Sequence, residues 1–349
     1  MMKPTDLLKK PVDCEFISQL LNRAIDGIRT YYILLTAIKL GIFDVLQTPR
    51  NAKTLSKELG CDEKLLSLFC ESLCELGILT KINDAYANSE MSRMYLTINS
   101  HLSQQIPVIN TERIVNLWCN LHEILKKGAT KFSREEFFSN YAIHSMAQTS
   151  LLGELQETVE FISNFPEFKN AKKLLDLGGG HGFYAIAFTA INENLKAYVF
   201  DLPNVIDRTK EYIKKYNATR VEVISGDFFV DELGKDYDII FSSYNPGGKK
   251  LELIPKIHSS LKEGGLYINK QFFPDVTDSN ALLNLEWNLW VFDGVKKVEK
   301  GNKIYSFKND VNLDEYIESL ESAGFEILEV VDVKSNVKGS KIIVTKKVT

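Results

Sequence analysis

The chain has few cysteines, no long hydrophobic run and no excess of positive charge. Five cysteines occur among 349 residues, and none of them forms a C-x-x-C arrangement. Cys70 and Cys74 stand one helical turn apart, and we interpret them as small buried hydrophobic residues rather than as metal ligands. The cysteine pattern therefore predicts no metal site and fits a reducing cytoplasm.

The hydrophobic runs are too short for a membrane span. The longest conspicuous run is Tyr31–Ile38, whereas a membrane helix needs roughly 18 apolar residues or more. The first residues lack the apolar region of a signal peptide, so we expect no export, no membrane contact and a cytoplasmic location. The net charge of −4 does not support non-specific nucleic-acid binding, which depends on a cationic surface.

Length and composition indicate an ordinary globular protein of two domains. Apolar residues make up 44% of the chain and charged residues 25%. Residues 13–46 carry apolar side chains at helical spacing, with a helix end expected at Gly41. So much apolar surface on an amino-terminal helix pair exceeds what one small domain needs. We interpret it as a dimer face, with a purely internal core as the alternative.

The order of elements up to residue 90 is that of a winged helix. A helix over residues 54–59, a break at Gly60 and a helix over residues 62–76 precede a hairpin that turns at Asn83-Asp84. In winged-helix proteins such a fold often binds DNA. Here the stretch in the place of a recognition helix, DEKLLSLFCESLCEL, is acidic and apolar, so we expect no nucleic-acid partner.

Residues 101–165 are mostly helical in pattern and rich in aromatic side chains. Within them the segment FFSNYAIHSMAQTS brings Tyr141, His144, Met146 and Ser150 close together. The segment can be an amphipathic linker helix, or a helix that joins the two domains and lines a substrate pocket. Both interpretations are kept open here.

The segment KKLLDLGGGHGFYAIAFTAI, residues 172–191, dominates the second half of the chain. A short apolar run predicts a buried strand, a glycine-rich turn follows, and residues 183–191 have the apolar density of a helix packed on a sheet. Glycine supplies a positive φ in the turn and leaves room for a ligand against the backbone. A dinucleotide fingerprint would need a third glycine where Phe183 stands. The spacing Asp-x-Gly-x-Gly-x-Gly from Asp176 is instead the pattern of S-adenosylmethionine-binding loops.

From residue 171 on, strands and helices alternate as in an open parallel sheet. We expect strands at 172–177, 196–200, 220–224, 237–242 and 264–271, with helices at 206–216 and 251–261 among those between them. The last two apolar runs, GFEILEVVDV and SKIIVTKK, are separated only by residues 334–339. They predict an antiparallel hairpin at one edge of the sheet. The alternation of strands and helices before it predicts the α/β fold class.

Acidic residues follow three of the predicted strands at the edge where open α/β sheets bind ligands. Asp176 closes the first strand, and Asp201 closes the second, where a carboxylate can accept hydrogen bonds from two ribose hydroxyls. Asp227 follows the third strand, where it can accept from an adenine amino group with Phe228 against the ring. Each aspartate alone can be a turn or cap residue, but three in register favour a nucleoside site.

The motifs DLGGGHG, FDLPNVI and GDFF, followed by LKEGGLYINK, resemble the class I S-adenosylmethionine-dependent methyltransferases of the caffeate/acetylserotonin O-methyltransferase type. The amino-terminal half resembles the winged-helix dimerisation domain of that family. The resemblance implies a homodimer and a Rossmann-like seven-stranded sheet with a reversed last hairpin. It also implies three parts: a dimerisation domain at 1–100, a helical linker lining the substrate pocket at 101–165, and a methyltransferase domain at 166–349.

The resemblance also implies how the cofactor S-adenosylmethionine is held. Gly178 and Gly180 would lie by its methionine part, Asp201 on the ribose, and Asp227 with Phe228 on the adenine. Ser150 matches a serine near the methionine part, and Met146 matches a methionine near the reacting centre. The residues expected to bind the cofactor are Asp176, Gly178, Gly180, Asp201, Leu202, Asp227, Phe228, Ser243, Ser150 and Met146.

The chain departs from this family at the catalytic base. In the family a His-Asp-Trp segment follows the fourth strand, and its histidine deprotonates the acceptor hydroxyl. Here the region reads DIIFSSYNPGGKKLELI, with Gly247 about where the histidine belongs. Tyr141, His144 and Tyr244 are the candidates for a substitute base, although a packing or pocket-lining role is the more common one for such residues. A thiol, or an acceptor with its own negative charge, needs a base least.

The sequence therefore predicts a methyltransferase that acts on an oxygen, sulfur or nitrogen atom of a small molecule, with oxygen as the first choice and sulfur as the second. A non-methylating enzyme of the same fold and a non-catalytic S-adenosylmethionine-binding dimer are the alternatives. Transfer of a labelled methyl group would indicate a methyltransferase, whereas tight binding without turnover would indicate the non-catalytic dimer.

Overall fold

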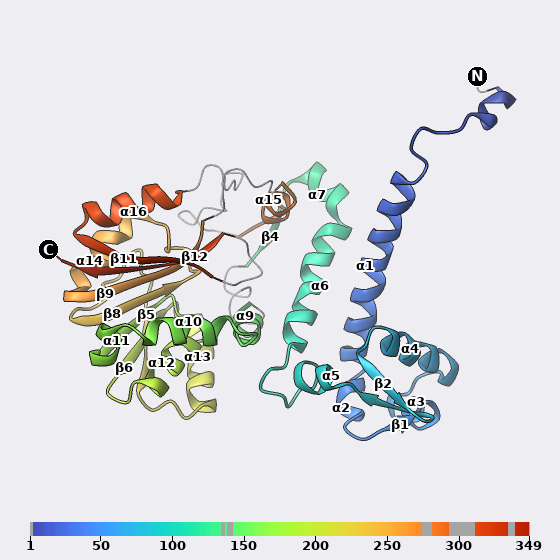
Figure 1. Ribbon diagram of the computed structural model, residues 1–349, viewed down its shortest axis with the longest axis horizontal. Coiled ribbons are helices and arrows are strands. Elements are labelled where there is room, and N and C mark those ends of the chain that lie inside the picture. Colours follow the sequence, from blue (N-terminus) through green and yellow to red (C-terminus); the bar gives the residue numbers. More distant parts are fainter. Residues whose placement is uncertain are drawn as a thin grey trace. The chain divides into compact units, whose positions relative to one another are not determined.

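The structure is a computed structural model that describes residues 3–133, 137, 142–273, 281–292, 311–333 and 339–348. The chain divides into two compact units, residues 1–109 and residues 110–349, whose elements are labelled in Figure 1. The finer division of the chain at residues 100 and 165 stays a prediction. In the described part of the chain, no helix combines the length and the apolar character needed to cross a membrane.

The first unit consists of helices and one small sheet. Its helices are η1 (Pro4–Leu8), α1 (Phe16–Lys39), α2 (Ile42–Val45), α3 (Ala52–Leu59), α4 (Glu63–Glu75) and α5 (Glu90–Tyr95). An antiparallel sheet in the order β1–β3–β2 is formed by strands β1 (Arg50–Asn51), β2 (Leu79–Ile82) and β3 (Ala85–Asn88). The boundary between the units falls within α6 (Gln105–Cys119).

The local signals in this unit act as predicted. Gly41 and Gly60 have φ values of 69° and 66° and stand where α1 and α3 have ended. Asp62 is the N-cap of α4, because its side chain accepts a hydrogen bond of 2.9 Å from the Leu65 N–H. Asn83 has a φ of 54° in the turn between β2 and β3.

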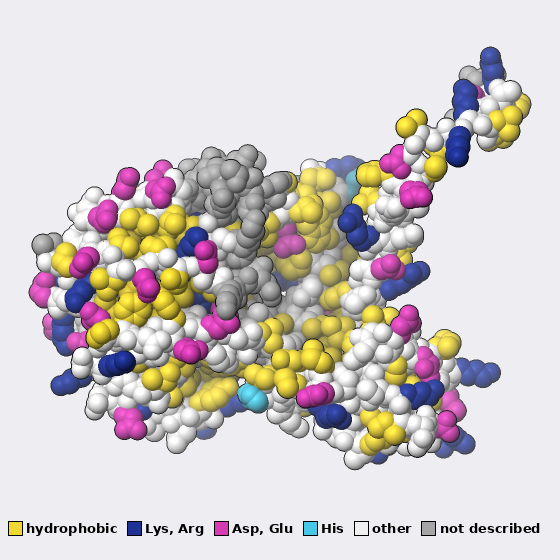
Figure 2. All heavy atoms as spheres, in the orientation of Figure 1, with side chains coloured by type: hydrophobic (Ala, Val, Ile, Leu, Met, Phe, Trp, Pro, Cys, Tyr) yellow, Lys and Arg dark blue, Asp and Glu magenta, His cyan; other side chains and the backbone are white. Residues whose placement is uncertain are grey.

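Helix α1 is buried only near its carboxyl end, where Leu35, Ala37 and Ile38 enter the core of the first unit. The segment 16–30 is exposed throughout. Its exposed apolar side chains are Phe16, Ile17, Leu20, Leu21, Ile25 and Ile28. Figure 2 shows apolar side chains in yellow along this helix. Since a helix with so many exposed apolar residues is poorly solvated, this stretch is suited to cover another surface.

The second unit is organised around a seven-stranded mixed sheet in the order β11–β12–β9–β8–β5–β6–β7. Its strands are β5 (Lys173–Leu177), β6 (Lys196–Asp201), β7 (Val221–Ser225), β8 (Tyr237–Ser243), β9 (Leu261–Phe272), β11 (Phe325–Asp332) and β12 (Ser340–Lys347). Strands β5 to β9 run parallel, and β12 is antiparallel to both β9 and β11. The reversed hairpin at the sheet edge is thus confirmed.

Helices cover both faces of this sheet (Figure 1). One face packs against α10 (Glu154–Ser163), α11 (Pro166–Asn170), α12 (Phe183–Ile191) and α13 (Pro203–Lys215). The other face packs against α14 (Ile254–Ser260) and α16 (Leu313–Ser322). Along β5, Leu174 belongs to the first core and Leu175 to the second, as the alternation of side chains in a strand requires.

The predicted strands agree with the observed ones to within a residue or two, except that β9 begins three residues earlier than expected, at Leu261. The helix predicted at 206–216 begins at Pro203, because proline is well suited to the first turn of a helix. The helix predicted at 251–261 is a 3₁₀ turn, η3 (Leu251–Leu253), followed by α14. The turn of the last hairpin, residues 334–338, lies outside the described residues.

A third, smaller hydrophobic cluster belongs to the same unit. It contains part of α6, α7 (Leu121–Lys127), α15 (Ala281–Asn288), and the parallel pair β4 (Thr130–Phe132) and β10 (Trp290–Phe292). Rings of Phe132, Phe137 and Trp290 pack together there, and the Arg113 guanidinium lies 3.9 Å from the centre of the Phe137 ring. The strand pair was not foreseen, because residues 101–165 were expected to be mostly helical.

Candidate functional site

The glycine-rich turn between β5 and α12 needs left-handed backbone conformations at alternate positions. Gly178, Gly180 and Gly182 have φ values of 65°, 53° and 74°. Residues with a Cβ rarely adopt such values, so the turn depends on glycine. The Gly178 N–H donates to the Phe200 carbonyl at 2.8 Å, which joins the start of the turn to the neighbouring strand β6.

Two of the glycines also lack room for a side chain. A Cβ on Gly178 would lie 2.8 Å from the Cβ of Asn245, and a Cβ on Gly179 would lie 2.5 Å from the carboxyl carbon of Asp176. Gly180, in contrast, has nothing within 4 Å of its Cβ position. The backbone of the turn is therefore packed against polar side chains on the inside and is open at Gly180.

Asp176 lies beneath this turn with only 1% of its surface exposed. Burial raises the pKa of its carboxyl to about 7, the Ala185 N–H opposes the shift by donating to it, and the charge of Asp201 adds to it. Within the described part of the chain its Oδ2 atom has no hydrogen-bond partner. A buried carboxyl with an unsatisfied oxygen and a second acidic group nearby makes this place favourable for a cationic or hydrogen-bond-donating ligand.

Asp201 links the glycine turn to the next strand. Its Oδ2 accepts a hydrogen bond of 2.8 Å from the Gly180 N–H, and its Oδ1 accepts one of 2.7 Å from the Leu202 N–H. Leu202 is the N-cap of α13, and the hydroxyl of Thr209 in that helix donates to the Gly180 carbonyl at 2.6 Å. The predicted site residues Gly180 and Leu202 are thus both hydrogen-bonded to the third, Asp201.

Asp227 and Phe228 follow β7 at the same edge of the sheet. The Asp227 Oδ1 accepts from the Phe229 N–H at 3.0 Å, and its own N–H donates to Asp231. The Phe228 ring is buried and packs against Phe229 with ring centres 4.8 Å apart. Gly226, which precedes them, donates its N–H to the Asp201 carbonyl at 3.0 Å, so the loops after β6 and β7 are joined.

The predicted residues before the sheet lie on α9 (Ile143–Ser150). Ser150 is buried and its hydroxyl donates to the Ala147 carbonyl at 2.9 Å, whereas Met146 is 46% exposed. The His144 Nδ1 lies 2.7 Å from the Tyr212 hydroxyl of α13, and burial, together with the charge of Arg208, lowers the pKa of His144. Tyr141, the remaining candidate of this segment, lies outside the described residues.

The loop after β8 is folded back over the end of β5. The Asn245 side chain donates to the Leu177 carbonyl at 2.6 Å and to the Ser242 hydroxyl at 2.8 Å, and it accepts from the Gly247 N–H. A Cβ on Gly247 would lie 2.6 Å from both Phe228 and Leu253. An imidazole at Gly247, the position where the resemblance places the family histidine, would therefore displace the Phe228 and Leu253 side chains.

Ser243 is the last residue of β8, and Tyr244 follows it. Ser243 is in register with Lys270 of β9, and the Tyr244 N–H donates to the Lys270 carbonyl at 2.9 Å. Tyr244 has a φ of 47°, an uncommon value for a tyrosine, and its side chain is 39% exposed. Of the three base candidates, Tyr244 is the one that directly follows a parallel strand at the ligand-binding edge.

Sequence reasoning missed Lys270 and Asn245. Lys270 is wholly buried, and its ammonium donates to the Tyr184 hydroxyl at 2.7 Å. A lysine within the otherwise strand-like run LYINKQFF was a signal of an unusual position, since a charged residue is rarely buried without a partner. Nothing in the local pattern around Asn245 indicated its contacts with β5.

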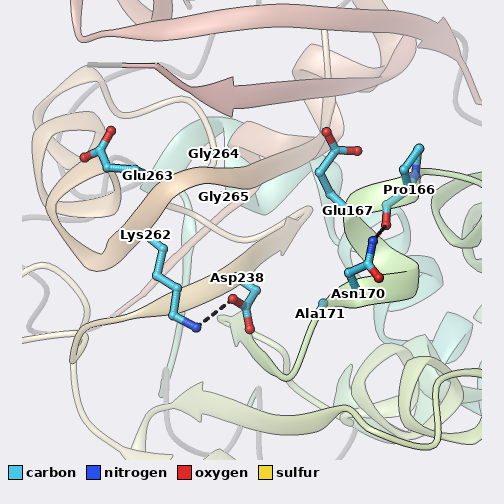
Figure 3. Close-up of a pocket in the computed structure, with 9 residues that line it drawn as sticks. All are labelled: Pro166, Glu167, Asn170, Ala171, Asp238, Lys262, Glu263, Gly264 and Gly265. Carbon is cyan, nitrogen blue, oxygen red and sulfur yellow. Dashed lines mark hydrogen bonds and ion pairs between the residues drawn. The ribbon is translucent and has the colours of Figure 1, made fainter.

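A different hollow, of about 320 Å³, lies at the opposite edge of the sheet (Figure 3). It is lined by α11 and by the first residues of β8 and β9, where Asp238 forms an ion pair of 2.7 Å with Lys262. Asp238 also accepts hydrogen bonds from the Lys172 and Lys173 N–H groups. Its charge is satisfied within the protein and it lies at the amino ends of the strands, so this hollow is not the candidate site.

A glycine turn after β5, with acidic residues at the carboxyl ends of β5 and β6 and just after β7, defines an α/β enzyme of the Rossmann-like methyltransferase class. Profiles of the O-methyltransferase domain and of the O-methyltransferase dimerisation domain match residues 130–268 and 22–98. A protein of Methanocaldococcus jannaschii described as uncharacterized is 43% identical over 94% of this chain and 89% of its own length. The chain belongs to the O-methyltransferase family and is an S-adenosylmethionine-dependent methyltransferase.

Two further relatives illustrate the similarity. Acetylserotonin O-methyltransferase of Bos taurus is 26% identical over 77% of this chain and 84% of its own. The crystal structure of human N-acetylserotonin methyltransferase in complex with S-adenosylmethionine has a TM-score of 0.72 at 21% identity, covering 97% of this chain and all of that one. At this identity the structural likeness concerns the fold.

Replacing Asp176 with asparagine should make the stability of the protein less dependent on pH. The folded state raises the pKa of this carboxyl from 3.8 to about 7, so the folded state holds its proton more tightly than the unfolded state. The stability of the wild type is then highest below about pH 4 with respect to this group and falls by a few kcal/mol, in order of magnitude, as the pH rises through 7. Asp176→Asn should therefore gain stability over the wild type progressively between pH 4 and pH 8.

Thermal unfolding of both proteins at several pH values measures this difference. Asp207→Asn, which removes a carboxylate exposed on α13, is the control and should give a small, constant difference. If the stability difference between Asp176→Asn and the wild type were also independent of pH, the raised pKa of the Asp176 carboxyl would be contradicted.

Proposed function

We propose that the edge of the sheet at the glycine turn holds S-adenosylmethionine and that the enzyme transfers its methyl group to a small-molecule acceptor. In this proposal Gly178 and Gly180 lie along the methionine part and Asp201, with Leu202 beside it, binds the ribose. Asp227 and Phe228 bind the adenine, and Asp176, Ser243, Ser150 and Met146 complete the cofactor site. The observation that carries the proposal is the bonded set of Gly180, Asp201 and Leu202 above the buried Asp176.

The residues present suit the charges of this cofactor. Its methionine part carries an ammonium and a sulfonium, both positive, and Asp176 offers an unsatisfied buried oxygen near a second carboxylate. The glycine turn leaves no space for a Cβ at Gly178 and Gly179. A carboxylate at the end of β6 can accept from two hydroxyls at once, which is what a ribose presents.

S-adenosylmethionine supplies a methyl group that is already activated on a positively charged sulfur. The carbon–sulfur bond breaks as the bond to the acceptor forms, its electron pair stays on sulfur, and the acceptor's proton leaves to a base or to water. Holding the two reactants in line accounts for roughly 7–11 kcal/mol of the barrier. The protein's main task is then to position the acceptor and exclude water.

We propose oxygen as the acceptor atom in the first place and sulfur in the second. Oxygen agrees with the family to which the chain belongs. Sulfur has support because Gly247 has no room for a histidine, and a thiol with a pKa of about 8.5 needs a base less than an alcohol does. Tyr141, His144 and Tyr244 remain the candidates for a base, and the exposed side chain of Tyr244 at the end of β8 favours the last of these.

We also propose that the protein is a homodimer joined through α1. The dimerisation-domain match and the exposed apolar side chains of residues 16–30 support this assembly. Burying several such side chains against a second copy stabilises an interface by about 1.5–3 kcal/mol for each large residue that becomes fully buried.

Substituting Asp201 with alanine should weaken the binding of both S-adenosylmethionine and S-adenosylhomocysteine by about 10- to 100-fold, because it removes charge-assisted hydrogen bonds. Isothermal titration calorimetry measures both affinities. Asp207→Ala on the exposed face of α13 is the matched control and should bind as the wild type does. Equal affinities of Asp201→Ala and Asp207→Ala would exclude the proposed cofactor site.

Substituting Tyr244 with phenylalanine should lower turnover by about 10²- to 10⁴-fold if its hydroxyl is the base. The phenylalanine ring can still lie over Lys270, so affinity for S-adenosylhomocysteine should stay unchanged. Transfer of a labelled methyl group to the low-molecular-mass fraction of a cell extract measures turnover. If this variant turned over as fast as the wild type, the Tyr244 hydroxyl would not be the base that accepts the acceptor's proton.

Substituting Leu21 and Ile28 together with glutamate should convert the dimer to a monomer, because two charges would be buried in the apolar interface. Sedimentation equilibrium should then give the chain mass of 39.7 kDa instead of twice that value. Asn22→Glu, a polar position in the same exposed stretch, serves as the control. A monomeric wild type, or a double variant that remains dimeric, would exclude α1 as the interface.

A further inference from the structure

Lys270 is a charged residue in the interior of the sheet. Its exposed fraction is 0%, and it lies on β9 with its side chain among residues of α10 and α12. The ammonium donates to the Tyr184 hydroxyl at 2.7 Å and to the Thr158 hydroxyl at 3.1 Å. It also lies 5.1 Å from the centre of the Tyr244 ring.

Carboxylates of α10 oppose the effect of burial on this amine. Glu154, at the start of α10, forms an ion pair with the Lys270 ammonium, and its side chain is 25% exposed. Burial lowers the pKa of Lys270, whereas Glu154, by charge and by hydrogen bonding, and Glu157, by charge, raise it. Because the Glu154 carboxylate is partly exposed to solvent and the Lys270 ammonium is wholly buried, the positive charge of Lys270 is screened less than the negative charge of Glu154.

Lys270 contacts the helix that begins directly after the glycine turn. Its ammonium donates to the hydroxyl of Tyr184, and the Tyr184 ring centre lies 6.4 Å from that of the buried His181, which stands between Gly180 and Gly182. Burial lowers the pKa of His181 to about 4, and the charge of Lys270 adds to this shift. The ammonium and the glycine turn therefore share one poorly hydrated region, in which charges interact over longer distances than in water.

We propose that Lys270 sets how strongly the site distinguishes the positively charged methyl donor from its neutral demethylated product, and that Glu154 moderates this effect. The inference rests on the proposed function, in which the glycine turn holds the methionine part of the cofactor. A fixed positive charge repels a sulfonium but not a thioether. When the carbon–sulfur bond breaks, sulfur keeps the electron pair and loses its positive charge, so the repulsion is relieved as the methyl group leaves.

The test compares the dissociation constants of S-adenosylmethionine and S-adenosylhomocysteine by calorimetry. Lys270→Met, which keeps the length of the side chain but not its charge, should lower the ratio of the two constants, donor over product, by about fivefold or more. Glu154→Gln, which removes the counter-charge, should raise that ratio by a similar factor. Lys262→Met, at the opposite edge of the sheet, is the matched control and should leave the ratio unchanged.

If Lys270→Met does not fold, because Glu154 is left without its partner, the double variant Lys270→Met/Glu154→Gln and the single Glu154→Gln variant decide the matter. The inference would be overturned if the donor-to-product ratio of dissociation constants stayed within twofold of the wild type in the double variant and in Glu154→Gln. It would also be overturned if Glu154→Gln lowered the ratio. Either result would leave the proposed function intact. A wild type that binds neither molecule would instead overturn the proposed function.

Discussion

The contact between the Gly180 N–H and the Asp201 carboxylate is the interaction on which the site depends. It connects the turn after β5 to the end of β6, and the Leu202 N–H joins the same carboxylate to the start of α13. Because Gly180 has a positive φ and open space at its Cβ position, its backbone is presented outward while Asp201 holds it. These hydrogen bonds restrain the backbone of the turn within the protein itself.

Two buried charged groups near the glycine turn, Asp176 and Lys270, are neutralised to different extents. Among the described residues Asp176 has no cationic partner beneath the turn, whereas Lys270 has Glu154 as its counter-ion on the other side of Tyr184. In the proposed function, the acidic floor of the site attracts the positive charges of the methyl donor, and the nearby ammonium limits that attraction. This combination can favour both the binding of the donor and the departure of its methyl group.

The loop after β8 explains the departure from the catalytic pattern of the family. Asn245 closes this loop over the end of β5, and the space at Gly247 is filled by Phe228 and Leu253. The loop is therefore closely packed at Gly247 in the part of the chain that the structure describes. In the proposed function, catalysis then relies on positioning and on acceptors that ionise readily.

Much of the fold was predictable because its signals are local. The apolar runs of β5 to β8, the glycine spacing from Gly178 to Gly182, and the aspartates that follow the strands can each be identified within a few residues. The seven-stranded sheet and its reversed hairpin followed from these runs together with the family resemblance, whereas the order of the strands across the sheet was seen only in the structure. The pairing of β4 with β10 joins segments about 160 residues apart and leaves no such local signal.

The sequence by itself determined the α/β class, the position of the glycine turn and the absence of the family histidine, since these depend on residue type and spacing along the chain. Only the tertiary structure decided that Lys270 is wholly buried beside Tyr184 and Glu154, that Asp176 keeps an unsatisfied oxygen, and that Gly247 has no space around it. The physical reason is that burial, and with it the free energy of a charge, is set by segments that meet only when the chain has folded.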